Sequence, residues 1–322
     1  MPTGHAQPQR TTVAAYAERW LCAKSARLKP SVTAHYTAIL ADHILPHVGT
    51  TYLDALTRTD VIGWVAWAEK VIRPTGKTYA QETVRGWWRV LTCLLRDAAA
   101  EFGIPDPTMR VKPPKRSGGK RRERRTLDIR QLEVFLTSLR TVTPQRFAEA
   151  FTLAYTGLRP GEVYALRWED LDLEGGAIPI DKAVWHQEVG RPKTDDSRVV
   201  PLTPLMIEVL QVHRREMILE QHRGVSTGLV FPSINGKYRG GGTLLKPFAL
   251  ATAEAQIDIH VTPQVLRRSF NTIMRAMKVD QVVLRAMMGH SSAEMTDRYT
   301  GVDLDAKKDA VIRLQGHIGQ VP

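Results

Sequence analysis

The chain has few cysteines and no long hydrophobic run, and each scarcity excludes a class of protein. Its two cysteines, Cys22 and Cys93, cannot build a disulfide framework and are typical of a reducing compartment. No segment approaches the roughly 18 apolar residues of a membrane span. The first residues contain no apolar stretch of signal-peptide length. We therefore expect a cytoplasmic protein with no membrane partner, and the length of 322 residues favours two domains.

The motifs of several well-known catalytic sites are also missing. The sequence contains no Walker loop, no HExxH, no CxxC pair and no Gly-x-Ser-x-Gly elbow. His43 and His47 are four residues apart, but no set of carboxylates or cysteines joins them. We expect them to be ordinary surface or core histidines. Any catalysis is expected to need neither a bound metal ion nor another cofactor.

Positive charge is abundant and concentrated. The chain has 45 Lys and Arg against 33 Asp and Glu, a net charge of +12, which suits a polyanionic partner. Residues 110–125, RVKPPKRSGGKRRERR, hold nine of the basic residues and one Glu. Two prolines and two glycines predict an extended linker here, whose charges would lie along a phosphate backbone. A plain interdomain tether without a ligand is the alternative.

Hydrophobic spacing predicts helices on both sides of this linker. Four short helices are expected before it: one capped by Thr12, one from about Ser31 to Pro46, one opened by the Thr57–Asp60 capping box, and one from about Gln81. After the linker, helices are expected at 128–140, 144–156, 160–168, 204–222, 244–256, 264–277, 280–287 and 304–314.

Short β-rich runs interrupt the second part. GAIPI, KAVWHQEV and SRVVPL lie between Gly176 and Leu202 and are separated by turn residues. The sequence therefore predicts a mostly α protein with a small antiparallel β-sheet. Its expected parts are a tail at 1–10, a helical domain at 11–109, the basic linker at 110–125 and a second domain with a C-terminal tail at 126–322.

Four segments in the second part resemble the signatures of one family. They are TGLRPGEVYALRWEDLD at 156–172, GRPKTDDSRVVPL at 190–202, TPQVLRRSF at 262–270 and MMGHSSAEMTDRYTGVD at 287–303. In this order they resemble the tyrosine recombinases of the phage-integrase group, and the helical first part resembles their core-binding domain. The resemblance implies a site-specific DNA recombinase that needs no ATP. It would cleave and rejoin DNA through a 3′-phosphotyrosyl intermediate and a Holliday junction.

The resemblance assigns a role to five residues. Arg159 and Arg267 match the two catalytic arginines, and two guanidinium groups can hold the non-bridging oxygens of one phosphate. Lys193 matches the lysine that protonates the leaving 5′-oxygen, and His290 matches a histidine that hydrogen-bonds the phosphate. Tyr299, nine residues after His290, matches the nucleophile.

Other interpretations of these residues stay open. Arg159 could simply pair with Glu162 on the surface, and Lys193 could be a plain phosphate contact. Tyr299 could be a packed aromatic residue.

Gln264 departs from the family pattern TPHDLRRT, in which a histidine precedes the second arginine by three residues. A glutamine has donor and acceptor atoms but cannot take up a proton. If this position is a general base, its loss would slow the reaction by about 10²–10⁴-fold. We expect a working but slower enzyme. Val265, where an acidic residue often occurs, is a lesser departure.

The resemblance also implies partners. Double-stranded DNA is expected as the substrate and a homotetramer as the assembly on it. An excisionase or a host DNA-bending protein would be accessory partners, and the protein would associate with a bacterial nucleoid. The tail after Tyr299 includes LDAKKDAVIRL, which either docks on a neighbouring subunit or packs within its own. Candidate DNA contacts are Thr78, Gln81, Arg85, Lys112, Lys115, Arg116, Lys120, Arg121, Arg122, Arg124 and Arg125.

The integrase of a phage or another mobile element is the function that we predict. About ten residues precede the first expected helix, too few for a domain that binds accessory arm sites, which favours a simple core-site recombinase. Three alternatives remain at this point. They are a catalytically impaired DNA-binding relative, a recombinase that resolves plasmids or chromosomes, and a type IB topoisomerase-like enzyme.

Overall fold

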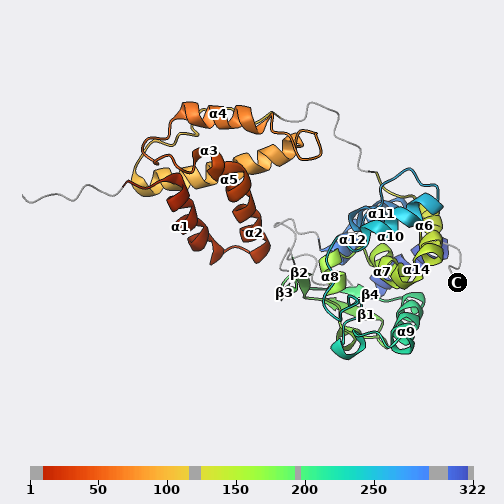
Figure 1. Cartoon of the computed structure of the whole chain (residues 1–322). Coiled ribbons are helices and arrows are strands. Elements are labelled where there is room, and N and C mark those ends of the chain that lie inside the picture. The colour runs from red at the N-terminus through yellow and green to blue at the C-terminus, as the bar shows by residue number, and fades with distance from the viewer. Residues whose placement is uncertain (1–9, 116–124, 193–196, 290–303, 318–322) are drawn as a thin grey trace, which may run out of the picture. The chain divides into compact units, whose positions relative to one another are not determined.

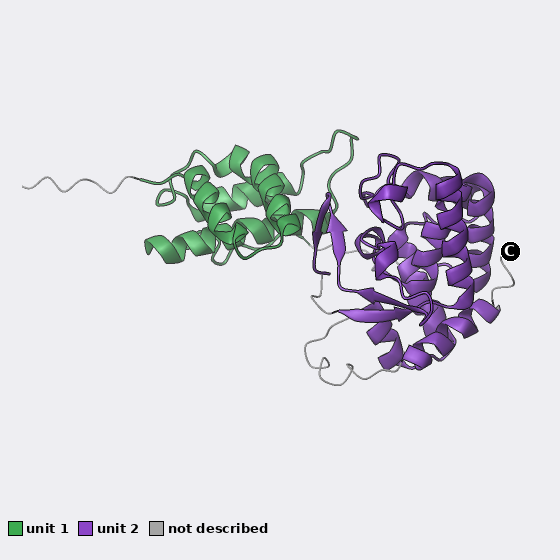
Figure 2. Ribbon diagram, turned by 90° about the horizontal axis from the view of Figure 1, so that it is seen from below, with its two compact units in different colours: residues 1–123 green, residues 124–322 purple. Residues whose placement is uncertain are grey.

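The computed structural model describes residues 10–115, 125–192, 197–289 and 304–317 (Figure 1). The chain forms two compact units, Met1–Glu123 and Arg124–Pro322 (Figure 2). The division between them falls within the basic segment 110–125. In the part of the chain that the structure describes, no helix is long and apolar enough to span a membrane.

Unit 1 is a small helical bundle. Thr12 and Thr57 cap helices as predicted: the Thr12 hydroxyl accepts a hydrogen bond from the Ala15 amide at 3.2 Å, and Thr57 forms a capping box with Asp60. The helices are α1 (Val13–Ser25), α2 (Pro30–Ile39), a π-helical turn (Leu40–Ile44), α3 (Leu45–Val48), α4 (Arg58–Ala68) and α5 (Gln81–Phe102).

Helix α5 is longer than expected. It has 22 residues, so the prediction of four short helices is wrong for this element. The strong helix formers of its second half, LLRDAAAEF, continue it without a break. It ends at Gly103, which adopts the left-handed conformation that terminates many helices.

Aromatic rings fill the core of unit 1. Trp20, Trp64 and Trp87 are all at most 5% exposed. The His43 ring stacks on Trp87 with ring centroids 3.7 Å apart, and burial lowers the pKa of His43 below its ordinary value. The His47 ring lies 3.7 Å from that of Trp67. Both histidines therefore serve in packing.

The beginning of the basic segment packs on unit 1. Arg58 donates a hydrogen bond to the Arg110 carbonyl oxygen at 3.0 Å, and Arg85 donates to that of Pro114 at 2.7 Å. The Lys115 amide donates to Glu69 at 2.8 Å. Residues 110–115 therefore belong to unit 1, and the rest of the segment up to residue 124 lies outside the described residues.

Unit 2 combines helices with short strands. Its first half contains α6 (Ile129–Val142), a 3₁₀ turn (Pro144–Arg146), α7 (Phe147–Thr156), α8 (Pro160–Tyr164), a 3₁₀ turn (Trp168–Asp170), β1 (Ala177–Ile180), β2 (Ala183–Trp185), β3 (Glu188–Gly190) and β4 (Arg198–Pro201). Its second half contains α9 (Pro204–Leu219), a 3₁₀ turn (Val225–Thr227), α10 (Leu245–Glu254), α11 (Pro263–Ala276), α12 (Gln281–Met288) and α14 (Leu304–His317).

Helix α7 forms the centre of unit 2. All ten of its residues are buried, and it packs against α6, α8, α9 and α11. The helix is mostly apolar, and its one charged residue, Glu149, is paired with Arg146 and Arg239, so other elements can enclose it on every side. The neighbouring α8 ends at Tyr164, earlier than the predicted 160–168. The reason is that the Arg167 backbone is extended and pairs with Leu229, while the Trp168 amide donates to the Gly228 carbonyl oxygen at 2.9 Å.

The strands form two antiparallel pairs, β1 with β4 and β2 with β3. The β-rich run KAVWHQEV contains a turn that was not predicted, and it forms the β2–β3 hairpin. Its turn residues His186 and Gln187 have φ of 47° and 75°. Positive φ at both central positions is typical of a tight hairpin turn, where Asn and Gly are the usual residues. The sequence signal for the turn was therefore absent.

Helix α14 packs within unit 2. Ala310, Val311 and Leu314 are at most 1% exposed, and the helix lies against α11, α12 and β4. Lys307 donates to the Val199 carbonyl oxygen at 3.2 Å and Lys308 to that of Gly175 at 2.7 Å. The described part of the tail, α14, therefore packs within its own unit.

Candidate active site

A sharp turn between α7 and α8 positions Arg159. Gly157 ends α7 with φ of 62°, and a Cβ at this position would lie 2.5 Å from the Phe270 ring. Only glycine allows this approach at this φ without strain. The chain then turns so that Arg159 is the N-terminal cap of α8, followed by Pro160 at the first helical position. A quarter of the Arg159 side chain is exposed.

Glu162 binds Arg159 and a second arginine. Its side chain is 1% exposed, and it accepts hydrogen bonds from the Arg159 amide at 2.8 Å and from Arg159 Nη1 at 2.9 Å. Arg198 donates hydrogen bonds to both carboxylate oxygens, from Nη2 at 2.6 Å and from Nη1 at 3.2 Å. Burial alone would raise the pKa of Glu162, but the hydrogen bonds and charge of Arg198, followed by those of Arg159, hold the pKa below its ordinary value.

Arg267 completes the cluster from α11. It is 3% exposed, donates through Nη1 to the Gly157 carbonyl oxygen and through Nη2 to that of Met288 at 2.7 Å. Burial and then the positive charge of Arg159 lower the pKa of Arg267 to about 10. The guanidinium is therefore still charged at neutral pH.

The cluster has an excess of positive charge. Arg159, Arg198 and Arg267 contribute three positive charges, and the Glu162 carboxylate contributes one negative charge. Arg198 and Arg267 are buried and directed at protein atoms, so Arg159 presents the exposed cationic edge. A buried excess of positive charge is most stable when an anion neutralises it. The geometry is therefore that of an anion site suited to a phosphate.

The sequence analysis named two of these four residues, Arg159 and Arg267, as candidate catalytic residues. The expected pair of Arg159 with Glu162 exists, but Glu162 is buried rather than on the surface, and the pair is part of the larger cluster. Arg198 was missed. The available signal was an arginine at the start of a β-rich run within the lysine motif, but its partners are 36 and 89 residues away along the chain.

The remaining candidate catalytic residues are placed only in part. Gln264 is exposed on the first turn of α11, one turn before Arg267 and on the same side of the helix. Lys193, His290 and Tyr299 lie outside the described residues. Gly289, directly before His290, is described. Across the described ranges, no three His, Cys, Asp or Glu side chains are close enough to share a metal ion.

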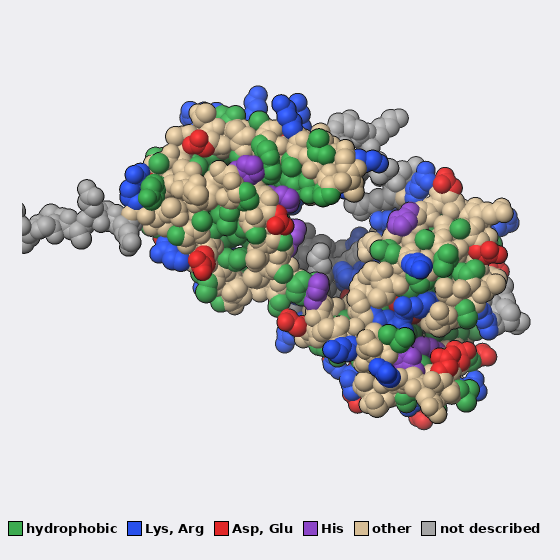
Figure 3. All heavy atoms as spheres, viewed as in Figure 1, with side chains coloured by type: hydrophobic (Ala, Val, Ile, Leu, Met, Phe, Trp, Pro, Cys, Tyr) green, Lys and Arg blue, Asp and Glu red, His purple; other side chains and the backbone are tan. Residues whose placement is uncertain are grey.

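The candidate DNA contacts that the structure describes are mostly on the surface. Thr78, Gln81, Lys112 and Lys115 are exposed. Arg85 is half-buried and binds the Pro114 carbonyl oxygen, and the exposed Arg125 donates to the Asp258 carbonyl oxygen at 2.6 Å. Figure 3 shows Lys and Arg side chains scattered over one face among acidic side chains. Arg116, Lys120, Arg121, Arg122 and Arg124 lie outside the described residues.

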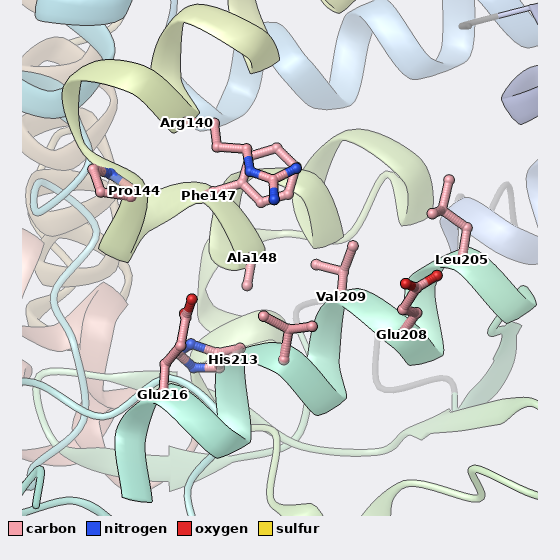
Figure 4. Close-up of a pocket in the computed structure, with 10 residues that line it drawn as sticks. Arg140, Pro144, Phe147, Ala148, Leu205, Glu208, Val209, His213 and Glu216 are labelled. Carbon is pink, nitrogen blue, oxygen red and sulfur yellow. The ribbon is translucent and has the colours of Figure 1, made fainter. Parts of the chain in front are cut away.

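A groove of about 390 Å³ lies elsewhere in unit 2. Figure 4 shows Val209 and His213 of α9 on one side of it, facing Phe147 and Ala148 of α7. None of the described candidate catalytic residues, Arg159, Gln264 and Arg267, lines this groove. It is therefore separate from the arginine cluster.

Two solved integrase structures share this fold. The Tn1549 transposon integrase in complex with transposon right end DNA has a TM-score of 0.72 and 18% identity, covering 95% of this chain and 100% of that one. A lambda integrase dimer bound to a COC′ core site has a TM-score of 0.65 and 16% identity, covering 91% and 100%. The fold is therefore the fold of these integrases.

Sequence relatives and family models agree with the fold. A prophage phiRv2 integrase of Mycobacterium tuberculosis is 29% identical over 300 residues, covering 88% of this chain and 72% of the relative. The tyrosine recombinase XerD of Listeria monocytogenes is 28% identical over 271 residues, covering 81% and 83%. The phage integrase family model matches residues 125–305, and the model of the N-terminal SAM-like domain of phage integrases matches residues 12–66. The chain belongs to the phage integrase family.

Three predictions from the sequence are thereby confirmed. They are the membership in the tyrosine recombinases, the mostly helical fold with a small antiparallel sheet, and the function of a site-specific recombinase in the integration of mobile elements.

Proposed function

We propose that the arginine cluster binds the scissile phosphate of double-stranded DNA and that Tyr299 attacks it. The observation that carries this proposal is the cluster itself, with three guanidinium groups around one buried carboxylate. Arg159 offers its exposed edge to a non-bridging oxygen, and Arg267 strengthens the positive potential behind it. Such preorganised charge stabilises the pentacoordinate transition state.

The proposed reaction is a transesterification. The Tyr299 oxygen forms a bond to phosphorus and loses its proton, while the bond from phosphorus to the 5′-oxygen breaks. Lys193 gives a proton to the departing 5′-oxygen, and His290 hydrogen-bonds the phosphate. The phosphotyrosyl bond conserves the energy of the broken ester, so the reverse attack by a 5′-hydroxyl rejoins the strand without ATP.

Gln264 bears on the fate of the tyrosine proton. A glutamine amide can orient the phenol but cannot accept its proton. Water or His290 would take the proton instead. The proposed enzyme is therefore active, and removal of the Tyr299 proton limits its rate of strand cleavage.

The proposed assembly is a homotetramer that joins two DNA sites through a Holliday junction. Basic residues of segment 110–125 would contact phosphates, so that DNA affinity falls steeply with salt. Arg110, Lys112, Lys115 and Arg125 are the described members of this set, and all four are exposed. An excisionase or a host DNA-bending protein would set the direction of recombination, and the protein would act at the bacterial nucleoid.

A cleavage assay tests the proposal. Nicked duplexes tiled across the DNA that flanks the gene are incubated with the protein and resolved on a denaturing gel. A covalent band that disappears in the Tyr299→Phe variant is the expected result. Binding to a confirmed site without any covalent band would contradict the proposal and favour the second candidate, a DNA-binding relative that Gln264 has made inactive. Relaxation of supercoiled DNA that lacks a recombination site would indicate topoisomerase-like activity instead.

A further inference from the structure

We propose that Arg198 is a positioning residue of the recombination site, an inference that rests on the proposed function. It connects three parts of the site that are distant in the sequence. These are the Arg159–Glu162 turn, the end of α12 that leads to His290, and the strand that follows Lys193.

The contacts of Arg198 are directed inward. Its side chain is 6% exposed. Nη1 and Nη2 donate to the two Glu162 oxygens at 3.2 and 2.6 Å, and Nε donates to the Met287 carbonyl oxygen at 2.8 Å. All three nitrogens therefore bind protein atoms, and the side chain is placed to hold other residues rather than to bind the phosphate.

The bond to Glu162 determines how Arg159 is held. A buried carboxylate needs compensation from cations and hydrogen-bond donors. Arg198 supplies a two-pronged contact, and Arg159 adds only Nη1 and its backbone amide. Without Arg198, Glu162 would draw the Arg159 guanidinium toward itself. Arg198 thus lets Arg159 keep its exposed edge for a phosphate.

The bond to Met287 holds the C-terminal end of α12, which precedes His290 in the sequence. Arg198 binds the Met287 carbonyl oxygen and Arg267 binds that of Met288, so two cations hold the C-terminal end of α12. Gly289 follows with φ of 60°, and a Cβ there would lie 2.9 Å from Arg198 Nη1. The guanidinium therefore lies close against the residue that precedes His290.

Arg198 is also the first residue of β4, five positions after Lys193. Its three bonds fix the start of this strand. Before Lys193 in the sequence, Gln187 in the turn of the β2–β3 hairpin exchanges two hydrogen bonds with the Tyr238 backbone, at 2.8 and 3.1 Å. Arg198 thus holds described residues that precede His290 and follow Lys193 in the sequence.

The test compares two lysine substitutions. Arg198→Lys keeps the charge, but an ammonium cannot bind both Glu162 oxygens and the Met287 carbonyl oxygen in the same geometry. Arg239→Lys is the matched control, because Arg239 also binds a buried glutamate, Glu149, at 2.7 Å and has a side chain that is 10% exposed. The substrate is a nicked duplex with the site found in the cleavage assay.

Two quantities are measured under single-turnover conditions. The rate of covalent-complex formation should fall at least about tenfold in Arg198→Lys and stay within about threefold in Arg239→Lys, because small misplacements of reacting groups are costly. Affinity, measured for both in a Tyr299→Phe background, should change by less than about threefold. Thermal unfolding shows whether both variants are folded.

A third measurement separates positioning from general damage. A methylphosphonate at the scissile position removes the negative charge that Arg159 would neutralise. The fold reduction in the cleavage rate caused by Arg198→Lys should therefore be smaller on this neutral substrate. General damage to the fold would reduce the rate equally on both substrates. An equal reduction on both, or a rate within twofold of the unmodified protein on the natural phosphate, would overturn the role of Arg198. Absence of a covalent complex with the unmodified protein would overturn the proposed function itself.

Discussion

Arg267 donates a hydrogen bond from Nη2 to the Met288 carbonyl oxygen at 2.7 Å, so a candidate catalytic side chain of α11 also fastens the end of α12. Its other terminal nitrogen binds the Gly157 carbonyl oxygen at the turn before Arg159. The two arginines of the site therefore differ in kind. Arg267 is part of the protein interior, and Arg159 is partly open to solvent.

Because of this difference, a substitution by lysine should affect the free energy of unfolding much more at Arg267 than at Arg159. Arg159→Lys should change the free energy of unfolding by less than about 1 kcal/mol, because the side chain is partly exposed and the amide keeps its bond to Glu162. Strand cleavage should slow by about 10²–10³-fold. Arg267→Lys should lower the free energy of unfolding by about 2–4 kcal/mol, because one buried carbonyl oxygen loses its charged donor.

Denaturant titration and single-turnover cleavage measure the two effects. Equal losses of stability in the two variants would contradict the distinction between a buried and an exposed arginine.

Gly157 is predicted to be indispensable to the turn. Gly157→Ala should lower the free energy of unfolding by about 2–5 kcal/mol, since it combines a positive φ with a Cβ placed against Phe270. Gly63 in α4 is a suitable control, because nothing lies within 4 Å of a Cβ there. Gly63→Ala should be stabilising by up to about 1 kcal/mol. Thermal unfolding of both variants checks the prediction, which would be wrong if both were equally tolerated.

Gln264→His is predicted to accelerate the enzyme. A histidine one turn before Arg267 could take up the tyrosine proton, which should raise the cleavage rate by about 10–10²-fold. The gain should depend on pH, because only a neutral imidazole accepts a proton. Gln264→Asn is the control, since it keeps an amide and removes a methylene group. Single-turnover rates between pH 5.5 and 8 give the result, and a histidine variant no faster than the unmodified protein would refute this explanation of the departure.

His213 should make the stability of unit 2 depend on pH. It is 8% exposed with Nε2 at 2.8 Å from the Val230 carbonyl oxygen, and burial lowers its pKa. As the pH falls below about 6.5, the unfolded chain binds a proton that the folded chain does not bind, so the free energy of unfolding decreases.

Denaturant titrations of the unmodified protein and of His213→Gln at several pH values isolate this contribution. The difference between the two proteins should be constant above about pH 7 and should shift in favour of the variant as the pH falls. A difference that does not vary with pH would show that His213 does not contribute.

Local patterns predicted part of the fold and site. Thr57 and Asp60 specified a capping box within four residues, and the motif around Arg159 placed it at the start of α8. The hairpin turn at His186 and Gln187 was missed, because neither residue is typical of positive φ. Arg198 was missed because its role arises only when β4, α8 and α12 pack together. Features formed by residues close in the sequence could be inferred, whereas the binding of both Arg159 and Arg198 by Glu162 could not.

Glu162 makes substitutions in this region interdependent. One carboxylate closes the first turn of α8, holds Arg159 and balances Arg198. Losing Glu162 would leave a buried Arg198 without its counterion, and losing Arg198 first would make a later loss of Glu162 less harmful. Effects of single substitutions here will therefore not add. During evolution, substitutions at Glu162 and Arg198 are therefore expected to occur together. Whether one of them is tolerated depends on which residue changed first.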